Sequence, residues 1–281
     1  MKIVSWNING IRSNIICEGT LKKKFIYDSL QESNLKQLID KHNPDIICFQ
    51  ETKCSEEIGS RILPNDKLYP YKFWNESKGE GRRGYGYSGT SIWCKEKPLD
   101  IKYEFDDFKD NNGRFIYIEY ETFSLINMYV PNSGSNMEYR RDYWDVKLKN
   151  LMDSMIQKPF ILTGDFNVVH QEIDIWNPIT LKQGKMPGLL LHERNMFTKF
   201  LENYLDIYRE KNPNSNEYTW WNAITKSRLT NKGWRLDYFL IQKNQKNKKN
   251  QKNFINIINN CSIDNTIMGS DHCPIILDFL M

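Results

Sequence analysis

The sequence lacks any paired-cysteine motif. Its six cysteines form no Cys-x-x-Cys pair, and none has a histidine at the spacing of a zinc ligand. Several lie inside apolar runs, as Cys48 does in DIICFQE. This pattern argues against disulfide bonds and against a structural zinc site. We therefore expect reduced cysteines in the core of an intracellular protein.

A long apolar run is also missing. The first residues, MKIVSWNING, are typical of a strand rather than of a secretion signal, and no apolar stretch has the length that crosses a bilayer. No linker rich in Pro, Gly or Ser divides the chain, and we find no internal repeat. These absences predict one domain over residues 1–281 without membrane contact, in the nucleus if the source is a eukaryote and otherwise in the cytoplasm.

Charge gives a weak bias toward acidic partners. The net charge is +4 and the pI is about 8.5, which is compatible with nucleic acid but does not identify it. One segment, 242–253, reads QKNQKNKKNQKN, with five lysines and no acidic or apolar residue. We interpret it as an insertion loop exposed to solvent, in preference to a nucleic-acid clamp. We predict that its deletion leaves activity at physiological salt intact.

Short apolar runs recur along the chain, with helical stretches between them. A content of 40% hydrophobic and 13% aromatic residues is enough for a large core. The β-rich runs expected to form strands are 2–8, 45–51, 90–95, 114–120, 124–130, 159–166, 235–241 and 274–279. Segments with apolar residues at three- and four-residue spacing, expected to form helices with one buried face, are 34–43, 138–156 and 192–205. We therefore expect a β-sandwich flanked by helices.

Most of these strands end or begin at a compact group of polar residues. The groups are Asn7 and Asn9, Glu51, Tyr129 to Asn132, Asp165 and Asn167, Asp237, and Asp271 with His272. Each residue type is common at turns, and a single group would indicate nothing more. Their recurrence at strand ends predicts that they gather at one rim of the sheets. Such a cluster would hold carboxylates, amides, a tyrosine and a histidine, with no cysteine nucleophile and no serine in a nucleophile elbow.

The motifs around these residues resemble one family, in order and along nearly the whole chain. They read SWNINGIR, PDIICFQETK, GYSGTSIW, NMYVPNSG, LTGDFNV, EIDIWNP, GWRLDYFL and GSDHCPI. By these motifs the chain is similar to the apurinic/apyrimidinic endonucleases of the exonuclease III type. EIDIWNP and NKGWRLDYF look closer to the eukaryotic-type members.

The resemblance implies the endonuclease/exonuclease/phosphatase fold, a four-layered α/β sandwich of two mixed sheets packed face to face. It also implies a DNA-repair enzyme that hydrolyses the phosphodiester bond 5′ to an abasic site in duplex DNA, leaving a 3′-OH and a 5′-deoxyribose phosphate. Side activities of 3′→5′ exonuclease and 3′-phosphodiesterase type are expected. The expected partners are double-stranded DNA with abasic sites and base-excision-repair proteins, with the enzyme acting as a monomer.

A divalent metal is part of what the resemblance implies: Mg²⁺, with Mn²⁺ able to substitute. The hard oxygens of the strand-end cluster agree with that choice. By resemblance Glu51 is the principal ligand. The full set placed at or near the metal is Asn7, Asn9, Glu51, Asp165, Asn167, Asp271 and His272. Asn9 stands where eukaryotic-type members usually carry Asp, which removes one negative charge beside the metal.

The family's catalytic carboxylate matches Asp165 of GDFN, which would position or deprotonate the attacking water. Asn167, two residues on, would point to the same side of an extended segment. Asp237 matches the carboxylate that orients His272. That pair would fix the tautomer of His272 and favour its charged form, which suits contact with the scissile phosphate.

Further phosphate contacts are implied by position. Tyr129 and Asn132 match residues that contact the phosphate or assist the leaving group, and the resemblance does not decide between these roles. Arg12, Tyr87 and the basic, glycine-rich segment 78–89 are candidates for contacts with the DNA backbone.

The extruded abasic sugar would lie in a pocket lined by Trp220, Trp234 and Leu236, the positions that match the family's recognition residues. Without the resemblance, core packing is the simpler interpretation of tryptophans in strands. The same fold and catalytic set serve secreted nucleases, lipid phosphodiesterases, inositol-phosphate phosphatases and poly(A)-removing nucleases. GWRLDYF with the tryptophan pair argues against these alternatives. The unsubstituted catalytic set argues against a silent nucleic-acid-binding module.

Overall fold

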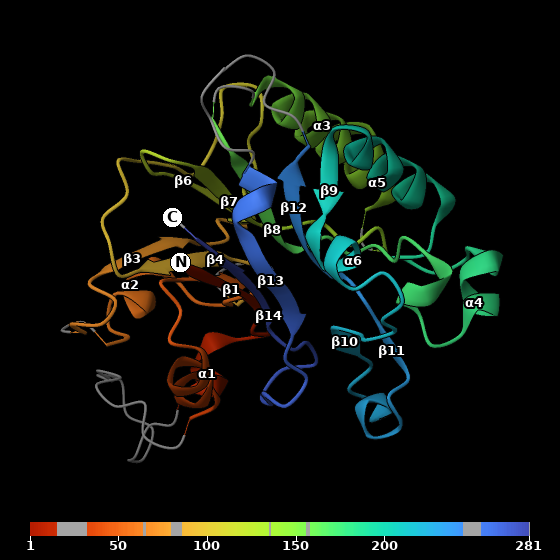
Figure 1. Ribbon diagram of the computed structural model, residues 1–281, viewed down its shortest axis with the longest axis horizontal. Coiled ribbons are helices and arrows are strands. Elements are labelled where there is room, and N and C mark those ends of the chain that lie inside the picture. The colour runs from red at the N-terminus through yellow and green to blue at the C-terminus, as the bar shows by residue number, and fades with distance from the viewer. Residues whose placement is uncertain are drawn as a thin grey trace.

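Two six-stranded mixed sheets pack face to face, with helices on their outer faces (Figure 1). The computed structural model describes residues 1–15, 33–63, 66–79, 86–134, 136–155, 158–243 and 254–280. The strand order is β13-β14-β1-β2-β4-β3 in the first sheet and β5-β6-β7-β8-β12-β9 in the second. This arrangement confirms the four-layered α/β sandwich expected from the sequence.

The strands of the first sheet are β1 (Lys2–Asn7), β2 (Ile46–Gln50), β3 (Tyr71–Asn75), β4 (Thr90–Cys94), β13 (Ile258–Ile263) and β14 (Ile275–Phe279). Those of the second are β5 (Asp100–Lys102), β6 (Phe115–Glu119), β7 (Ser124–Tyr129), β8 (Phe160–Asp165), β9 (Tyr204–Asp206) and β12 (Asp237–Gln242). A separate two-stranded ribbon consists of β10 (Trp220–Trp221) and β11 (Gly233–Trp234).

The helices are α1 (Asn34–His42), α2 (Glu56–Gly59), α3 (Asp145–Ser154), α4 (Pro178–Gln183), α5 (Leu191–Asn203) and α6 (Ile207–Lys211). Shorter helical turns are η1 (Ile11–Asn14), η3 (Tyr139–Trp144), η4 (Glu172–Asp174), η5 (Ser227–Thr230) and η6 (Phe254–Ile257). α1 lies against the outer face of the first sheet, and α3 and α5 lie against that of the second (Figure 1).

Alternation of side chains along the strands builds these layers. In β1, Ile3 faces the core between the sheets, whereas Val4 joins the cluster that contains Leu38 of α1. In β7, Leu125 faces the core between the sheets, and Ile126 joins the cluster formed with α3 and α5. Each central strand is therefore apolar on both faces, which is why these runs read as continuous apolar segments in the sequence.

Strand direction explains why polar residues meet at one edge. β1 runs parallel to β2 and antiparallel to β14, while β7 runs parallel to β8 and β8 antiparallel to β12. In each sheet the carboxyl ends of the two parallel strands therefore lie beside the amino end of an antiparallel strand. A hydrogen bond of 2.9 Å from Asn7 Nδ2 to Asp165 Oδ2 joins the two edges.

All eight predicted strands are present, with bounds that differ by one or two residues. The predicted helix 138–156 begins as the π-helical turn η3 and continues as α3, and the predicted helix 192–205 ends at Asn203, with β9 beginning at Tyr204. The strands not predicted from the sequence are β3, whose residues are mostly half-buried, the six-residue strand β13, and the short strands β5, β9, β10 and β11. Of the predicted insertion 242–253, residues 244–253 lie outside the described residues.

The cysteines of the described chain are unbonded and buried: Cys48, Cys54, Cys94, Cys261 and Cys273. This confirms the prediction of reduced core cysteines for these five, while Cys17 lies outside the described residues. No helix in the described ranges combines the length and apolarity that a membrane crossing requires.

Candidate active site

Asn7, at the end of β1, links two carboxylates from different sheets. Its Nδ2 donates to Glu51 Oε1 at 3.0 Å and to Asp165 Oδ2 at 2.9 Å. Glu51 follows β2, and Asp165 is the last residue of β8. Asn7 and Asp165 are buried, so the hydrogen bond between them forms with little competition from water. The strand-end residues therefore meet as the sequence predicts.

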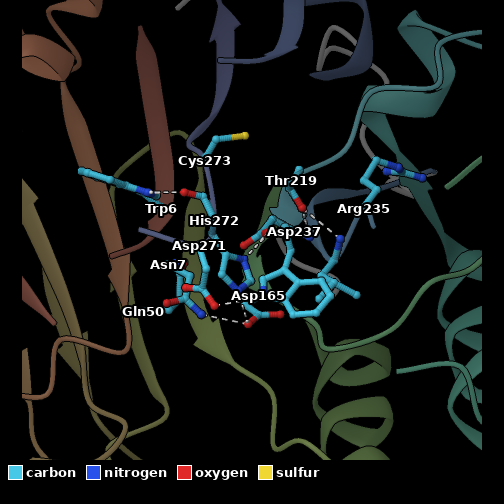
Figure 2. Close-up of polar contacts among 12 residues, drawn as sticks. Trp6, Asn7, Gln50, Asp165, Thr219, Arg235, Asp237, Asp271, His272 and Cys273 are labelled. Carbon is cyan, nitrogen blue, oxygen red and sulfur yellow. Dashed lines mark hydrogen bonds and ion pairs between the residues drawn. The ribbon is translucent and has the colours of Figure 1, made fainter. Parts of the chain in front are cut away.

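A row of three buried side chains continues from this link. His272 Nδ1 lies 2.9 Å from Asp237 Oδ2, and His272 Nε2 lies 3.7 Å from Asp165 Oδ2 (Figure 2). Asp165, Asp237 and His272 are at most 4% exposed. Asp237 and Asp165 are paired residues of β12 and β8, which places both carboxylates beside the histidine ring.

The pKa values in this row are shifted by burial and by charge. Burial alone would lower the pKa of His272, but the carboxylates of Asp237 and Asp165 raise it to about 10. Burial raises the pKa of Asp165 to about 7, with the charge of His272 opposing the rise and that of Asp237 adding to it. Near neutral pH, His272 is therefore a cation, and Asp165 is a carboxylate with appreciable affinity for a proton.

Asn167 completes the surroundings of Asp165. Its backbone N–H donates to Asp165 Oδ1 at 2.8 Å, and its Nδ2 donates to the Val130 carbonyl at 2.9 Å. The φ of Asn167 is 49°, in the left-handed region, so the expectation of an extended segment here is wrong. The turn brings Asn167 back over Asp165 instead. Asn132 Nδ2 donates to Asn167 Oδ1 at 3.2 Å and thereby joins the same group.

Tyr129, the last residue of β7, is a neutral phenol in this site. Burial raises its pKa well above the usual value, and the charge of Glu51 adds to this effect. A phenol that keeps its proton can donate a hydrogen bond to a phosphate oxygen but cannot act as a base. The Arg114 guanidinium lies 4.8 Å from the centre of the Tyr129 ring and donates to Tyr87 Oη at 2.9 Å. The sequence analysis did not anticipate Arg114.

Asp271, which precedes β14, is held on both carboxylate oxygens. Oδ1 accepts a hydrogen bond from Asn9 Nδ2 at 2.8 Å, and Oδ2 accepts one from the indole Nε1 of Trp220 at 3.0 Å. Ser270 Oγ donates to the Asn7 carbonyl at 2.7 Å and fixes the loop that carries Asp271. Asn9 and Asp271 therefore lie together, as the sequence predicts.

Lys53 is a second residue that the sequence analysis missed. Its ammonium lies 2.9 Å from Glu51 Oε2 and also contacts Asn9 Oδ1. Glu51 and Lys53 both have φ near +50°, and this tight turn brings the lysine back over the carboxylate two residues earlier. Lysine two residues after a strand-end glutamate is ordinary, so the ETK motif did not single out Lys53.

The oxygens around Lys53 fit a divalent cation of the hard type. Carboxylate and amide oxygens, as in Glu51, Asn9 and Asp271, are the donors that Mg²⁺ prefers. The oxygens of Glu51 and Asn9 already converge on one positive charge, the Lys53 ammonium. Within the described ranges, no three His, Cys, Asp or Glu side chains are grouped to hold a metal. A metal here would therefore depend on amide oxygens. Protonated His272 has no lone pair for a metal.

Comparison with known proteins identifies the family of this chain. Residues 4–272 match the model of the Endonuclease/Exonuclease/phosphatase family. The chain belongs to this family. It is 35% identical over 99% of its length to the DNA repair nuclease APEX1 of Danio rerio, covering 81% of that protein. It is 34% identical over 99% of its length to the exodeoxyribonuclease of Bacillus subtilis, covering 98% of that protein.

Solved structures of this family share the fold. The AP endonuclease LMAP of Leishmania major superposes with a TM-score of 0.78 at 23% identity, covering 98% of this chain and 86% of that one. An AP endonuclease from Archaeoglobus fulgidus superposes with a TM-score of 0.75 at 21% identity, covering 99% of both chains. The animal and bacterial sequence relatives are almost equally similar, so greater closeness to eukaryotic-type members is only weakly supported.

In this member of the endonuclease/exonuclease/phosphatase family, two half-buried tryptophans lie beside the carboxylate cluster. The ring centres of Trp220 and Trp234 are 5.0 Å apart and their planes are inclined by 57°. Both pack on a small apolar cluster that includes Leu236 and Leu189. The structure therefore brings Trp220, Trp234 and Leu236 together, and Trp220 contacts the candidate metal ligand Asp271 directly.

The other predicted DNA contacts lie at the margin of the site. Arg12 is an exposed residue of η1, a turn anchored by a 3.0 Å bond from Ile11 N to the Thr52 carbonyl near Glu51. Tyr87 is half-buried and joined to Arg114. Within the predicted segment 78–89, residues 80–85 lie outside the described residues.

Proposed function

We propose that this protein is a Mg²⁺-dependent AP endonuclease, a DNA-repair enzyme that hydrolyses the phosphodiester bond 5′ to an abasic site in duplex DNA. The observation that carries the proposal is the contact of one buried carboxylate, Asp165, with both the cationic His272 and the Asn7 bridge to Glu51. Relatives named as a DNA repair nuclease and as an exodeoxyribonuclease cover nearly the whole chain and support the substrate class.

Asp165 is suited to activate the attacking water. A carboxylate with a pKa of about 7 accepts a proton near neutral pH, and the hydrogen bonds from Asn7 and from the Asn167 backbone fix its two oxygens. The water oxygen forms a bond to phosphorus while its proton passes to Asp165. The bond from phosphorus to the 3′ oxygen breaks, and this oxygen takes up a proton from solvent, which leaves a 3′-OH and a 5′-deoxyribose phosphate.

The scissile phosphate would be bound by donors around this carboxylate. The His272 imidazolium, the Tyr129 phenol and the Asn132 amide supply N–H and O–H groups for the phosphate oxygens and for the leaving 3′ oxygen. Asp237 keeps the ring of His272 in place through the 2.9 Å bond to Nδ1. These groups are fixed before the substrate arrives, so little reorganisation is needed during the reaction.

Glu51, Asn9 and Asp271 would hold the metal, with Mn²⁺ as a substitute for Mg²⁺. When bound, the metal supplies Lewis-acid stabilisation of negative charge on the phosphate and on the leaving oxygen. Before it binds, Lys53 would have to leave the position between Glu51 and Asn9. The same site would support 3′→5′ exonuclease and 3′-phosphodiesterase reactions on DNA ends.

The test is a comparison of substrates with the purified protein. A labelled duplex with one abasic-site analogue should be cut on the 5′ side of the lesion in Mg²⁺ and remain intact in EDTA. Inositol phosphates, phosphodiester lipids and poly(A) should remain uncleaved at the same enzyme concentration. Rapid turnover of one of these alternatives with no incision of abasic DNA would overturn the proposal, and duplex binding without any turnover would indicate a silent binding module.

A further inference from the structure

The β10–β11 ribbon, which carries Trp220 and Trp234, is joined to the catalytic loop through the backbone. Trp221 N donates to the Asp271 carbonyl at 2.9 Å, and Cys273 N donates to the Thr219 carbonyl at 2.8 Å. Between these two bonds, Trp220 forms an antiparallel bridge with His272. Strand β10 therefore lies between its partner strand β11 and residues 271–273, and it is hydrogen-bonded to both.

The side chain of Thr219, the residue directly before β10, adds a second connection. Thr219 Oγ1 accepts hydrogen bonds from the backbone N–H groups of Leu236 at 2.9 Å and of Asp237 at 3.2 Å (Figure 2). Thr219 is fully buried, so these bonds are shielded from water. The start of the strand that carries Asp237 is thereby fixed by the residue directly before Trp220.

The Trp220 side chain contacts both the Trp234 ring and the Asp271 carboxylate. The centre of its ring lies 5.0 Å from that of Trp234, so the two rings together form the aromatic pair expected to contact the sugar. Its Nε1 donates a hydrogen bond of 3.0 Å to Oδ2 of Asp271, which is a candidate metal ligand. An indole has one N–H and no other polar atom, so its ring position decides whether Asp271 receives this hydrogen bond.

We propose that Trp220 is a positioning residue for Asp271, so that the orientation of the metal-side carboxylate depends on the ring that contacts the substrate sugar. The inference rests on the proposed function, because it takes Asp271 as a metal ligand and the ring as a substrate contact. Hydrogen bonds from outer residues orient ligating carboxylates, and their loss typically weakens metal affinity or activity about 10- to 100-fold.

The hydrogen bond from Trp220 to Asp271 would affect substrate choice. A sugar without a base can lie against Trp220 while the indole N–H still faces Asp271. A group that pushes the ring aside breaks the hydrogen bond and leaves Asp271 with Asn9 as its remaining side-chain amide donor. Discrimination against such a substrate would then appear in kcat, because the misplaced carboxylate impairs the chemical step rather than binding.

Trp220→Phe is the variant that tests this role, and Trp234→Phe is its matched control. Both keep an aromatic ring in the ribbon and remove one indole N–H. Among the residues that the structure describes, only Trp220 donates from its ring to Asp271. The first readout is Mn²⁺ affinity, measured by electron paramagnetic resonance without DNA. The second is kcat and KM for incision of abasic duplex.

Trp220→Phe should weaken Mn²⁺ binding about 10-fold, whereas Trp234→Phe should leave Mn²⁺ affinity unchanged. In Trp220→Phe, kcat should fall with little change in KM. Equal Mn²⁺ affinity and equal kcat in Trp220→Phe and the wild type would overturn the inference. The wild type could bind Mn²⁺ without incising abasic DNA, while Trp220→Phe binds Mn²⁺ more weakly. In that case Trp220 does position Asp271, and the proposed function fails.

Discussion

His272 and Asp237 form a buried pair, with Nδ1 of the ring 2.9 Å from Oδ2 of the carboxylate. The two residues are 35 positions apart in the sequence, and the strands that they adjoin belong to different sheets. Asp237 is the first residue of β12, and His272 lies just before β14. The pair therefore fixes one sheet against the other at the edge where the remaining strand-end residues gather.

Replacing Asp237 with Asn should lower the pKa of His272. Burial favours the neutral ring, and the Asp237 charge is the largest contribution that raises the pKa from 6.5 to about 10. Because the folded-state pKa is the higher one, the pair stabilises the fold fully below pH 6.5, and this contribution is lost as the pH rises through about 10. The loss of stability in Asp237→Asn should therefore be largest at low pH.

The measurement is an NMR titration of the histidine rings in metal-free protein. The His272 signal should titrate at lower pH in Asp237→Asn than in the wild type. His170, whose pKa is lowered by burial, serves as the internal control and should not change. A wild-type His272 that titrates at the ordinary value of 6.5 would contradict the account.

Asn7→Ala should slow incision strongly without unfolding the protein. The substitution removes the two hydrogen bonds, of 3.0 and 2.9 Å, that hold Glu51 and Asp165 in place. Hydrogen bonds to charged groups are worth about 1.5–3 kcal/mol each, so the loss of one such bond in the transition state already corresponds to about a 10- to 100-fold lower single-turnover rate. Asn203→Ala, at the exposed end of α5, is the control. A rate equal to that of the control would show that the bridge is not needed.

Lys53→Gln should strengthen metal binding. In the wild type the ammonium lies between Glu51 and Asn9, and a metal ion and an ammonium cannot share the same oxygens. Relief of this competition corresponds to about 1 kcal/mol near the surface, or roughly fivefold in affinity. Calorimetric Mn²⁺ titration is the measurement, with Lys53→Arg as the variant that keeps the charge. Weaker binding in Lys53→Gln would mean that the lysine supports the ligands instead.

Arg235→Met should destabilise the fold. Arg235 is 1% exposed and forms ion pairs with Asp174 at 2.8 Å and Asp206 at 2.7 Å. Methionine would leave Asp206 buried without this partner, which costs about 3 kcal/mol or more. Urea unfolding should show this loss, and the control Arg141→Met, an exposed pair with Asp142, should show almost none. Equal midpoints for the two variants would contradict the prediction.

The sequence predicted the strands well because their signals are local. The eight apolar runs form strands, since a strand buried on both faces reads as a continuous apolar segment. The short strands β10 and β11 had no such signal, because they are two residues long and depend on pairing with each other and with residues 271–273. Tertiary contacts, not local propensity, form them.

The candidate site was predictable in its members but not in its contacts. Asn7, Glu51, Asp165 and His272 stand out because each interrupts an apolar run at a strand end. Lys53 gave no comparable signal, since lysine beside a strand end is ordinary, and its role depends on the left-handed backbone at Glu51 and Lys53. The hydrogen bond from Trp220 to Asp271 joins residues 51 positions apart, which no local pattern records.

The most direct test of the central claim is single-turnover incision of an abasic duplex in Mg²⁺ by the wild type and by Asp165→Asn. Asp107→Asn, an exposed substitution of the same kind, is the control. We predict cutting 5′ to the lesion by the wild type and the control, and a rate lower by about 100- to 10,000-fold in Asp165→Asn. Cleavage by folded Asp165→Asn at the wild-type rate would contradict the assignment of this carboxylate to water activation.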